Sequence, residues 1–473
     1  MRSARVALAR ADLVAPSLAV LATLAAVYVS VHKGPAVGLG LALVAGLFLT
    51  ALCGFLLVPH VALALTIPLF AFVPALKLFV APELGPVKDL VSLAAICAAV
   101  LTLLFERHAG RRPRVDGLLL LAVAGLAGLY FINVGGGHGL AWAQGVRLAS
   151  EPLVLLLAGM TLADPRRTLR WAMWSLIATS CAVALYGLLQ QLLGQWRLVD
   201  LGYSFGEQIR TVDGHLRSFG TLDEPFGYAA FLLMGLAAVV LWMRPGVPST
   251  LIGTVIAGGI LVSWVRTAAL ISLALLGLWL GRRGHTGSAA LLLGAAVAAS
   301  AALLVTAAGG SETRSFRAGN SALTLNGRLD AWKITLGDPV QWPFGQGVGV
   351  VGTAADRAAY TISRSEDAPH AGLAVDSGYL ATLADVGVVG LAVLLAIFAR
   401  AITLARAAIR RGHGSGWLAA GLLTVLALDA VARSSFTGFP TAFLGLFLLG
   451  LALAAGAPEE PVGRAKAAAG RPS

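Results

Sequence analysis

The stretch GYLATLADVGVVGLAVLLAIF (378–398) is apolar over almost its whole length. As a helix it is long enough to cross the roughly 30 Å of hydrocarbon in a lipid bilayer. Similar stretches recur along the chain, whose 473 residues are 58% hydrophobic and only 12% charged. A soluble protein carries about twice that charged fraction. Because lipid cannot satisfy open backbone groups, these stretches must be helices, and the sequence predicts an all-α integral membrane protein.

The apolar stretches predict about 12–14 transmembrane helices. The first, from about Leu13, lacks a small-residue cleavage site and is long enough to span, so we expect a membrane helix there rather than a cleaved signal peptide. No sequence period indicates an internal repeat. The stretches lie near 13–31, 36–57, 61–81, 88–105, 115–133, 147–163, 168–193, 226–243, 250–264, 267–281, 287–308, 377–404, 415–432 and 439–456.

These stretches and the connections between them divide the chain into five regions. We expect N-terminal transmembrane helices over 1–194, central transmembrane helices with a first outer loop over 195–308, a large extracytoplasmic helical loop over 309–376, C-terminal transmembrane helices over 377–457, and a disordered cytoplasmic tail over 458–473.

Basic residues alternate from one connection to the next, and this alternation predicts the topology. With the N-terminus in the cytoplasm, the basic connections at 106–114, 164–170, 281–285 and 406–413 all fall inside, as does the tail. Both termini are then cytoplasmic, and the loops at about 194–225 and 309–376 lie outside. This also accounts for the net charge of +12 without a nucleic-acid partner. The short outer connections hold few basic residues: Lys33, Lys88, Arg147, Arg266 and Arg433.

The stretch NGRLDAWKITLGDPVQWPFGQGVGVVG (326–352) breaks the apolar pattern within the longest outer loop. Loops longer than about 15 residues are usually functional or disordered. Trp332 and Trp342 favour a folded loop, which we expect to cover an outer cavity. The GQGVG turn lacks the Lys and Ser/Thr of a nucleotide-binding loop, and its glycines would let backbone approach closely.

Arginines near the outer membrane ends are candidates for binding a phosphate or pyrophosphate group. Inserting an arginine at the centre of a membrane helix costs about 2.5–3.5 kcal/mol on insertion scales. A guanidinium group can form two parallel hydrogen bonds to the oxygens of one phosphate. Each arginine could equally be an interfacial anchor or the partner of an acid such as Glu151, Asp223 or Asp330. For Arg266 we favour a functional role over an interfacial anchor, because a turn between two apolar segments rarely needs a charge. The four candidates are Arg147, Arg217, Arg266 and Arg328.

Asp376 and His370 precede the last group of apolar stretches and are candidates for a general base. Asp376 could also be the N-cap of the helix that follows. Gln190, near the outer end of another stretch, either lines a sugar cavity or anchors the interface. No His, Cys and Asp cluster has metal-ligand spacing. The three cysteines each lie within an apolar stretch and are expected to be small core residues: Cys53, Cys97 and Cys181.

Four stretches follow one another along the chain: RSFGTLDEPFGYAAFLL, LVSWVRTAALISLALL, RLDAWKITLGDPVQWPFGQGVG and DSGYLATLADVGVVGL. In this order they resemble the O-antigen ligase and O-antigen polymerase superfamily of bacterial envelope glycan enzymes. Arg217 opens the first and Arg266 lies in the second, which resembles a Ser/Thr-x-Ser-Arg element with Val265 where Ser is common. The fourth carries Asp376-Ser377 where ligases have His-Asn, which favours a polymerase.

The resemblance implies a glycosyltransferase of the bacterial inner membrane with its active site on the periplasmic side. Its donor would be an undecaprenyl-pyrophosphate-linked oligosaccharide, its acceptor a glycan or lipid, and it would need no metal or other cofactor. A chain-length regulator is a candidate partner. Arg217 and Arg266 would stabilise the leaving pyrophosphate, and Asp376 or His370 would take the acceptor's proton. The residues expected to bind pyrophosphate or glycan are Arg328, Arg147, Trp332, Tyr379, Gln190 and Glu224.

Two other functions remain open from the sequence. A ligase would move a finished glycan onto a lipid or protein acceptor in one step. A lipid-linked oligosaccharide flippase or other transporter would suit the number of membrane segments, but transporters tend to show internal repeats and charges at mid-membrane depth. This chain shows no repeat, and its charges are expected to lie outside the apolar stretches.

Overall fold

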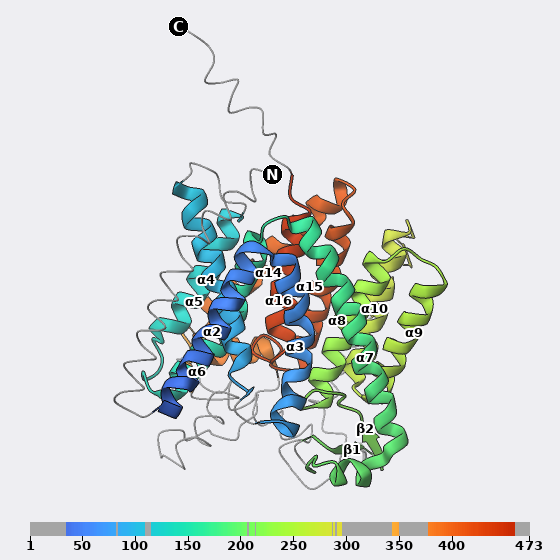
Figure 1. Cartoon of the computed structure of the whole chain (residues 1–473). Coiled ribbons are helices and arrows are strands. Elements are labelled where there is room, and N and C mark those ends of the chain that lie inside the picture. Colours follow the sequence, from blue (N-terminus) through green and yellow to red (C-terminus); the bar gives the residue numbers. More distant parts are fainter. Residues whose placement is uncertain are drawn as a thin grey trace.

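The computed structural model of the protein describes residues 35–81, 84–108, 115–205, 208–212, 214–285, 287–288, 291–295, 343–349 and 377–458. These residues form a bundle of helices with one short β-hairpin (Figure 1). The elements are α2 (Pro35–Leu57), α3 (Pro59–Phe79), α4 (Val87–His108), α5 (Gly117–Ile132), α6 (Leu140–Thr161), α7 (Pro165–Asp200), β1 (Arg210–Val212), β2 (His215–Arg217), α8 (Pro225–Trp242), α9 (Val247–Val262), α10 (Arg266–Arg282), α14 (Gly378–Arg410), α15 (Gly414–Ala432) and α16 (Thr441–Ala455).

The helices agree with the predicted all-α membrane fold. Within the described residues, six helices are long and apolar enough to cross a membrane: α3, α4, α7, α8, α14 and α15. Shorter apolar helices are α5, α9, α16 and residues 42–57 of α2. The predicted stretch near 13–31 lies outside the described residues, and the stretch near 287–308 lies largely outside them. Each of the other predicted stretches corresponds to one helix, and the total number of transmembrane helices stays a prediction.

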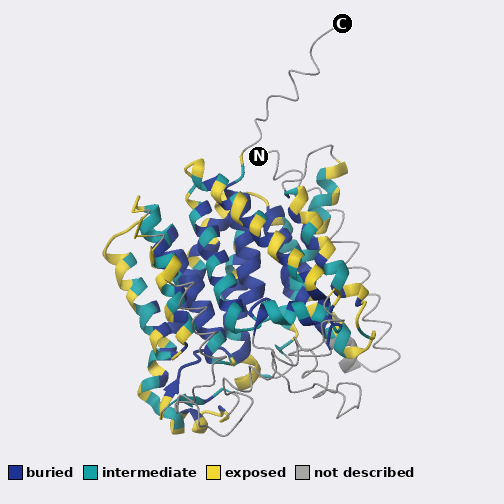
Figure 2. Ribbon diagram, turned by 180° about the vertical axis from the view of Figure 1, so that it is seen from behind, coloured by how far each residue is buried: buried dark blue, intermediate teal, exposed yellow. Residues whose placement is uncertain are grey.

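Buried residues are concentrated in the middle of the bundle (Figure 2). Every residue of α16 is buried, and α16 packs closely on α6 because glycines face the contact. A Cβ on Gly450 would lie 1.9 Å from the Leu156 carbonyl oxygen, and one on Gly159 would lie 2.2 Å from that of Phe447. Small residues are what allow helices to approach in lipid. Large apolar side chains such as Leu65 and Leu121 are exposed on outer helices, as expected for a surface in contact with lipid tails.

The bundle has two chemically different ends. The hairpin end holds β1 and β2, where α7, α9 and α15 finish and α8, α10, α14 and α16 begin (Figure 1). At the opposite end, arginines donate to carbonyls at helix C-termini, where the helix dipole favours a cation. Arg400 also makes a two-pronged ion pair with Asp116, at 2.9 and 2.6 Å. The three arginine–carbonyl pairs are Arg166 with Ala455, Arg282 with Leu241 and Arg411 with Gly456.

One predicted boundary is wrong, because α6 begins at Leu140, so that Arg147 lies inside this helix and not in the connection before it. The stretch predicted to end near 193 does end at a break, at Gly194, whose φ is 73°. Helical turns that the sequence did not predict follow this break as far as Asp200. Beyond it, β1 and β2 pair antiparallel, with Val212 opposite His215. The first turns of α6 and the last turns of α7 are less apolar than the rest of these helices. Tertiary contacts hold them, and no local sequence pattern predicts such contacts.

Candidate functional site

Gln190 fixes the segment that leads from β2 into α8. Its side chain is fully buried, its Nε2 donates to the Gly220 carbonyl at 2.9 Å, and its Oε1 accepts from the Phe219 and Gly220 amides at 3.1 and 3.0 Å. The φ of Gly220 is +59°, and a Cβ there would meet Tyr228 at 2.6 Å, so only glycine fits this turn. With both polar atoms bonded to backbone, Gln190 has a positioning role. Its contact with a sugar stays a prediction.

A small hydrophobic cluster holds the hairpin against α7. Leu198, Ile209, Leu216 and Phe219 are buried there with Tyr203. The Tyr203 hydroxyl lies 3.0 Å from that of Tyr186, and burial raises the pKa of Tyr203 well above its ordinary value. The hairpin is therefore a fixed part of this end of the bundle.

Arg217 joins the hairpin to the turn that carries Arg266. Its side chain is buried, its Nε donates to the Ser263 carbonyl at 3.3 Å, and its guanidinium carbon lies 4.6 Å from the centre of the Phe226 ring. The Ser218 amide also donates to the Val262 carbonyl at 3.0 Å. Arg266, three residues beyond Ser263, is the first residue of α10 and is exposed. Two arginine motifs separated in sequence thus meet at the hairpin end.

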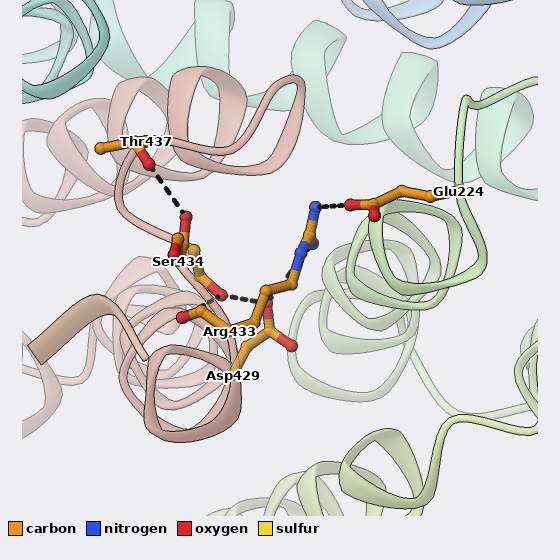
Figure 3. A network of polar contacts seen from close by, with 6 residues as sticks. Glu224, Asp429, Arg433, Ser434 and Thr437 are labelled. Atoms are coloured by element: carbon orange, nitrogen blue, oxygen red, sulfur yellow. Dashed lines mark hydrogen bonds and ion pairs between the residues drawn. The ribbon is translucent and has the colours of Figure 1, made fainter. Parts of the chain in front are cut away.

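A second polar assembly at this end connects the start of α8 with the end of α15 (Figure 3). Arg433, which ends α15, has its Nη2 2.5 Å from the Glu224 carboxylate and its Nη1 3.7 Å from that of Asp429. The hydroxyl of Ser435 donates to the Asp429 carboxylate. The Arg433 carbonyl accepts a hydrogen bond from the Gly378 amide at 2.8 Å, and this bond connects the first residue of α14 to the assembly. Arg433 lies between two carboxylates, so its charge is balanced by the protein itself.

Asp429 and Arg433 are not among the predicted site residues. Asp429 is 3% exposed and lies inside α15, one of the helices able to cross a membrane. The expectation that the charges lie outside the apolar stretches is wrong for this residue. A carboxylate within an apolar stretch is itself a signal for a buried partner, and the arginine four residues later is that partner. Glu224, predicted to bind substrate, is held in the same assembly.

The first turn of α14 carries one further predicted site residue, Tyr379. Ser377 is the N-cap of this helix, because its Oγ accepts from the Leu380 amide at 3.5 Å. The N-cap that the structure describes is thus Ser377. The Tyr379 hydroxyl donates to the Ala427 carbonyl at 2.9 Å, so this predicted glycan-binding residue also braces α14 on α15. Four predicted site residues lie outside the described residues: Asp376, His370, Arg328 and Trp332.

Arg147 forms part of a third charged group at the hairpin end. Asp89 accepts from Lys88 at 2.6 Å and from Arg147 at 2.8 Å. The Lys88 ammonium lies 5.0 Å from the centre of the Phe439 ring, next to the start of α16. The Arg147 side chain is 43% exposed, whereas that of Lys88 is 14% exposed. In this structure Arg147 is therefore the ion-pair partner of an acid, Asp89. Its contact with pyrophosphate stays a prediction.

The glycine-rich turn at 343–349 packs on the backbone of two other segments. A Cβ on Gly345 would lie 2.5 Å from the Ala384 carbonyl oxygen, and one on Gly347 would lie 2.5 Å from Gly136 Cα. The Gln346 amide donates to the Ala384 carbonyl at 2.6 Å, beside the break in α14 at Gly387. The expected close approach of this turn is therefore to other backbone of the chain, and it holds the break in place.

Metal ligation and disulfide bonding find no support in the part of the chain that the structure describes. No group of three or more His, Cys, Asp or Glu side chains there could hold a metal ion. The three cysteines are free thiols and half-buried, and two of them, Cys97 and Cys181, pack against the hydrophobic core, so the expectation of small core residues is confirmed in part.

The hairpin end therefore combines Arg217 docked on the Arg266 turn with two ion-paired groups that hold the surrounding helices together. Comparison of the chain with models of protein families and with curated proteins found no match.

Proposed function

We propose that this protein is a membrane glycosyltransferase that polymerises glycan repeats carried on undecaprenyl pyrophosphate, for O-antigen or exopolysaccharide assembly. The reaction takes place at the hairpin end, on the outer leaflet of a bacterial plasma membrane. The observation that carries the proposal is the docking of Arg217 on the turn leading into Arg266, which joins two arginine motifs. The resemblance of four ordered stretches to the O-antigen ligase and polymerase superfamily supports the same reaction.

In this reaction the acceptor's hydroxyl oxygen attacks the anomeric carbon of the donor sugar. The bond from that carbon to the pyrophosphate oxygen breaks, and undecaprenyl pyrophosphate leaves with the bonding electrons. Asp376 or His370 takes the hydroxyl proton. The donor is already activated by its pyrophosphate, so the transfer requires no nucleotide.

Arg217 and Arg266 stabilise the charge that develops on the leaving pyrophosphate. Groups held in place before the reaction are the most effective at this, because they need no reorganisation when the charge develops. The Ser263 carbonyl and the Phe226 ring hold the Arg217 guanidinium in such a fixed orientation. Arg266 is exposed at the start of α10, where it can meet a phosphate group at the membrane surface. Arg328 of the large loop is the third arginine of the proposed site.

A reaction with purified protein tests the function. The protein, reconstituted in lipid, is incubated with a radiolabelled lipid-linked repeat purified from cells that lack this protein. We expect a ladder of lipid-linked products and release of undecaprenyl pyrophosphate. One capped product on an added lipid or protein acceptor would instead indicate a ligase. Movement of the donor across the bilayer without any transfer would indicate a transporter and would contradict the proposal.

The proposed side of the membrane gives a separate prediction. Single cysteines are introduced at Ser204, exposed at the hairpin end, and at His285, exposed at the opposite end, in a chain whose native cysteines are alanine. A membrane-impermeant maleimide added to intact cells should label the Ser204→Cys chain and leave the His285→Cys chain unlabelled until the membrane is opened. Labelling in the reverse order would place the hairpin end in the cytoplasm.

A further inference from the structure

Trp264, in the turn between α9 and α10, has a backbone conformation that bulky residues rarely adopt. Its φ is +54°, in the left-handed region that glycine and asparagine prefer. Such a conformation persists only where the surrounding structure imposes it, and it is concentrated at ligand sites. A turn without a ligand to contact would more readily use glycine at this position. The positive φ of Trp264 therefore indicates that its indole contacts a ligand.

The indole is held rigidly and presented outward. The His215 imidazole of β2 stacks on it nearly parallel, with 5.1 Å between ring centres and 16° between planes. The hairpin that carries His215 is itself bonded to the end of α9 through the Ser218 amide and the Val262 carbonyl. Trp264 nevertheless stays 49% exposed. Its aromatic surface is thus preorganised and open at the hairpin end.

Each residue of this aromatic pair is two positions along the chain from one of the two arginines of the proposed pyrophosphate site. Arg217 is two residues after His215 on β2, so the two side chains share one face of the strand. The Arg217 Nε bonds the carbonyl of Ser263, the residue before Trp264, and Arg266 is two residues after Trp264. A group covalently attached to a pyrophosphate bound by these arginines would lie against the stacked pair.

We propose that Trp264, backed by His215, is a stacking platform for a pyranose ring of the lipid-linked glycan, next to the pyrophosphate. The C–H bonds on the flat side of a pyranose carry partial positive charge, and the face of an indole is negative, so the two attract each other. The platform recognises the ring shape more than any one hydroxyl. This inference rests on the proposed function.

Steady-state transfer kinetics of Trp264→Leu and Trp264→Gly test the platform. We expect the KM for the lipid-linked repeat to rise roughly 2- to 10-fold in both, with kcat close to that of the parent. Undecaprenyl pyrophosphate without sugar, added as a competitor, should inhibit parent and variants with the same inhibition constant. The Gly variant should unfold no more easily than the parent, because glycine adopts a positive φ without strain.

Trp174→Leu is the matched control, because Trp174 is 51% exposed and packs edge-on against Trp242 at the opposite end of the bundle. An equal KM rise in this control would mean that both tryptophans only anchor the protein at the membrane surface, and would overturn the platform. It is also overturned if the KM of the Trp264 variants is unchanged, or if the competitor's inhibition constant rises as much as the KM. A parent protein that transfers no glycan would instead count against the proposed function itself.

Discussion

Replacing Arg266 by lysine is expected to slow glycan transfer by roughly 10- to 150-fold while leaving the fold intact. A lysine keeps the positive charge but loses the planar fork that can hold two phosphate oxygens at once. A charge-assisted hydrogen bond contributes about 1.5–3 kcal/mol, and each 1.4 kcal/mol lost from the transition state slows the reaction tenfold. Arg266 is exposed at the first position of α10, and lysine is of similar length and the same charge, so the variant is expected to fold. The measurement is kcat for the purified variant, with expression and thermal unfolding checked.

Two companion variants make the result specific. Arg266→Ala should be slower still, since it removes the charge as well as the fork. Arg411→Lys changes a residue at the opposite end, where the guanidinium donates to the Gly456 carbonyl at 2.8 Å, and should transfer glycan at the parental rate. If Arg266→Lys transfers as fast as the parent, Arg266 is an interfacial charge and its role toward pyrophosphate is wrong.

Gly347→Ala is expected to lower the free energy of unfolding by about 2–5 kcal/mol. The φ of Gly347 is +103°, which strains any residue with a Cβ, and that Cβ would lie 2.5 Å from Gly136 Cα and 2.6 Å from the Gly136 amide nitrogen. Both are backbone atoms, so no side chain can turn aside to make room. The turn would have to move off residues 135–136 and lose the bond from the Val348 amide to Asn133, which is 2.6 Å long. Denaturant titration in detergent micelles measures the loss.

Gly202→Ala separates the crowding from the strain. Gly202 has a similar φ of +97°, but no atom lies within 4 Å of the position that a Cβ would take. This variant should lose only the strain cost of about 1–2 kcal/mol. Equal losses in the two variants would show that the contact between the glycine-rich turn and residues 135–136 contributes nothing to stability.

The positions of the central helices could be predicted from the sequence because apolar length alone determines them. The stretch expected at 226–243 is α8, and the stretch expected at 415–432 is α15, each within one residue of the observed start. In lipid a helix is the only way to pair all backbone groups, so no competing structure needs to be weighed. The same reasoning could not give the first turns of α6. Trp142 holds them by donating to the Phe131 carbonyl at 3.2 Å, a contact between two separate elements.

The candidate site was predictable only in part. The arginine motifs suggested that Arg217 and Arg266 act together, and the structure brings the first onto the turn of the second. The partner of Arg147 could not be foreseen, since Asp89 lies on another helix and nothing in its neighbourhood marks the pair. The Asp429–Arg433 pair was visible as a spacing of four residues, but its link to Glu224 depends on how α8 packs against α15.

An experimental structure of the protein with undecaprenyl pyrophosphate bound tests most directly whether the arginines at the hairpin end bind the leaving pyrophosphate. We expect the diphosphate at the hairpin end, with the guanidinium groups of Arg217 and Arg266 about 2.7–3.2 Å from its oxygens. Arg328 is expected to close the same cavity. A diphosphate bound elsewhere would contradict the account. So would guanidinium groups of these arginines more than roughly 20 Å apart, since even a mobile side chain could not then reach the same diphosphate.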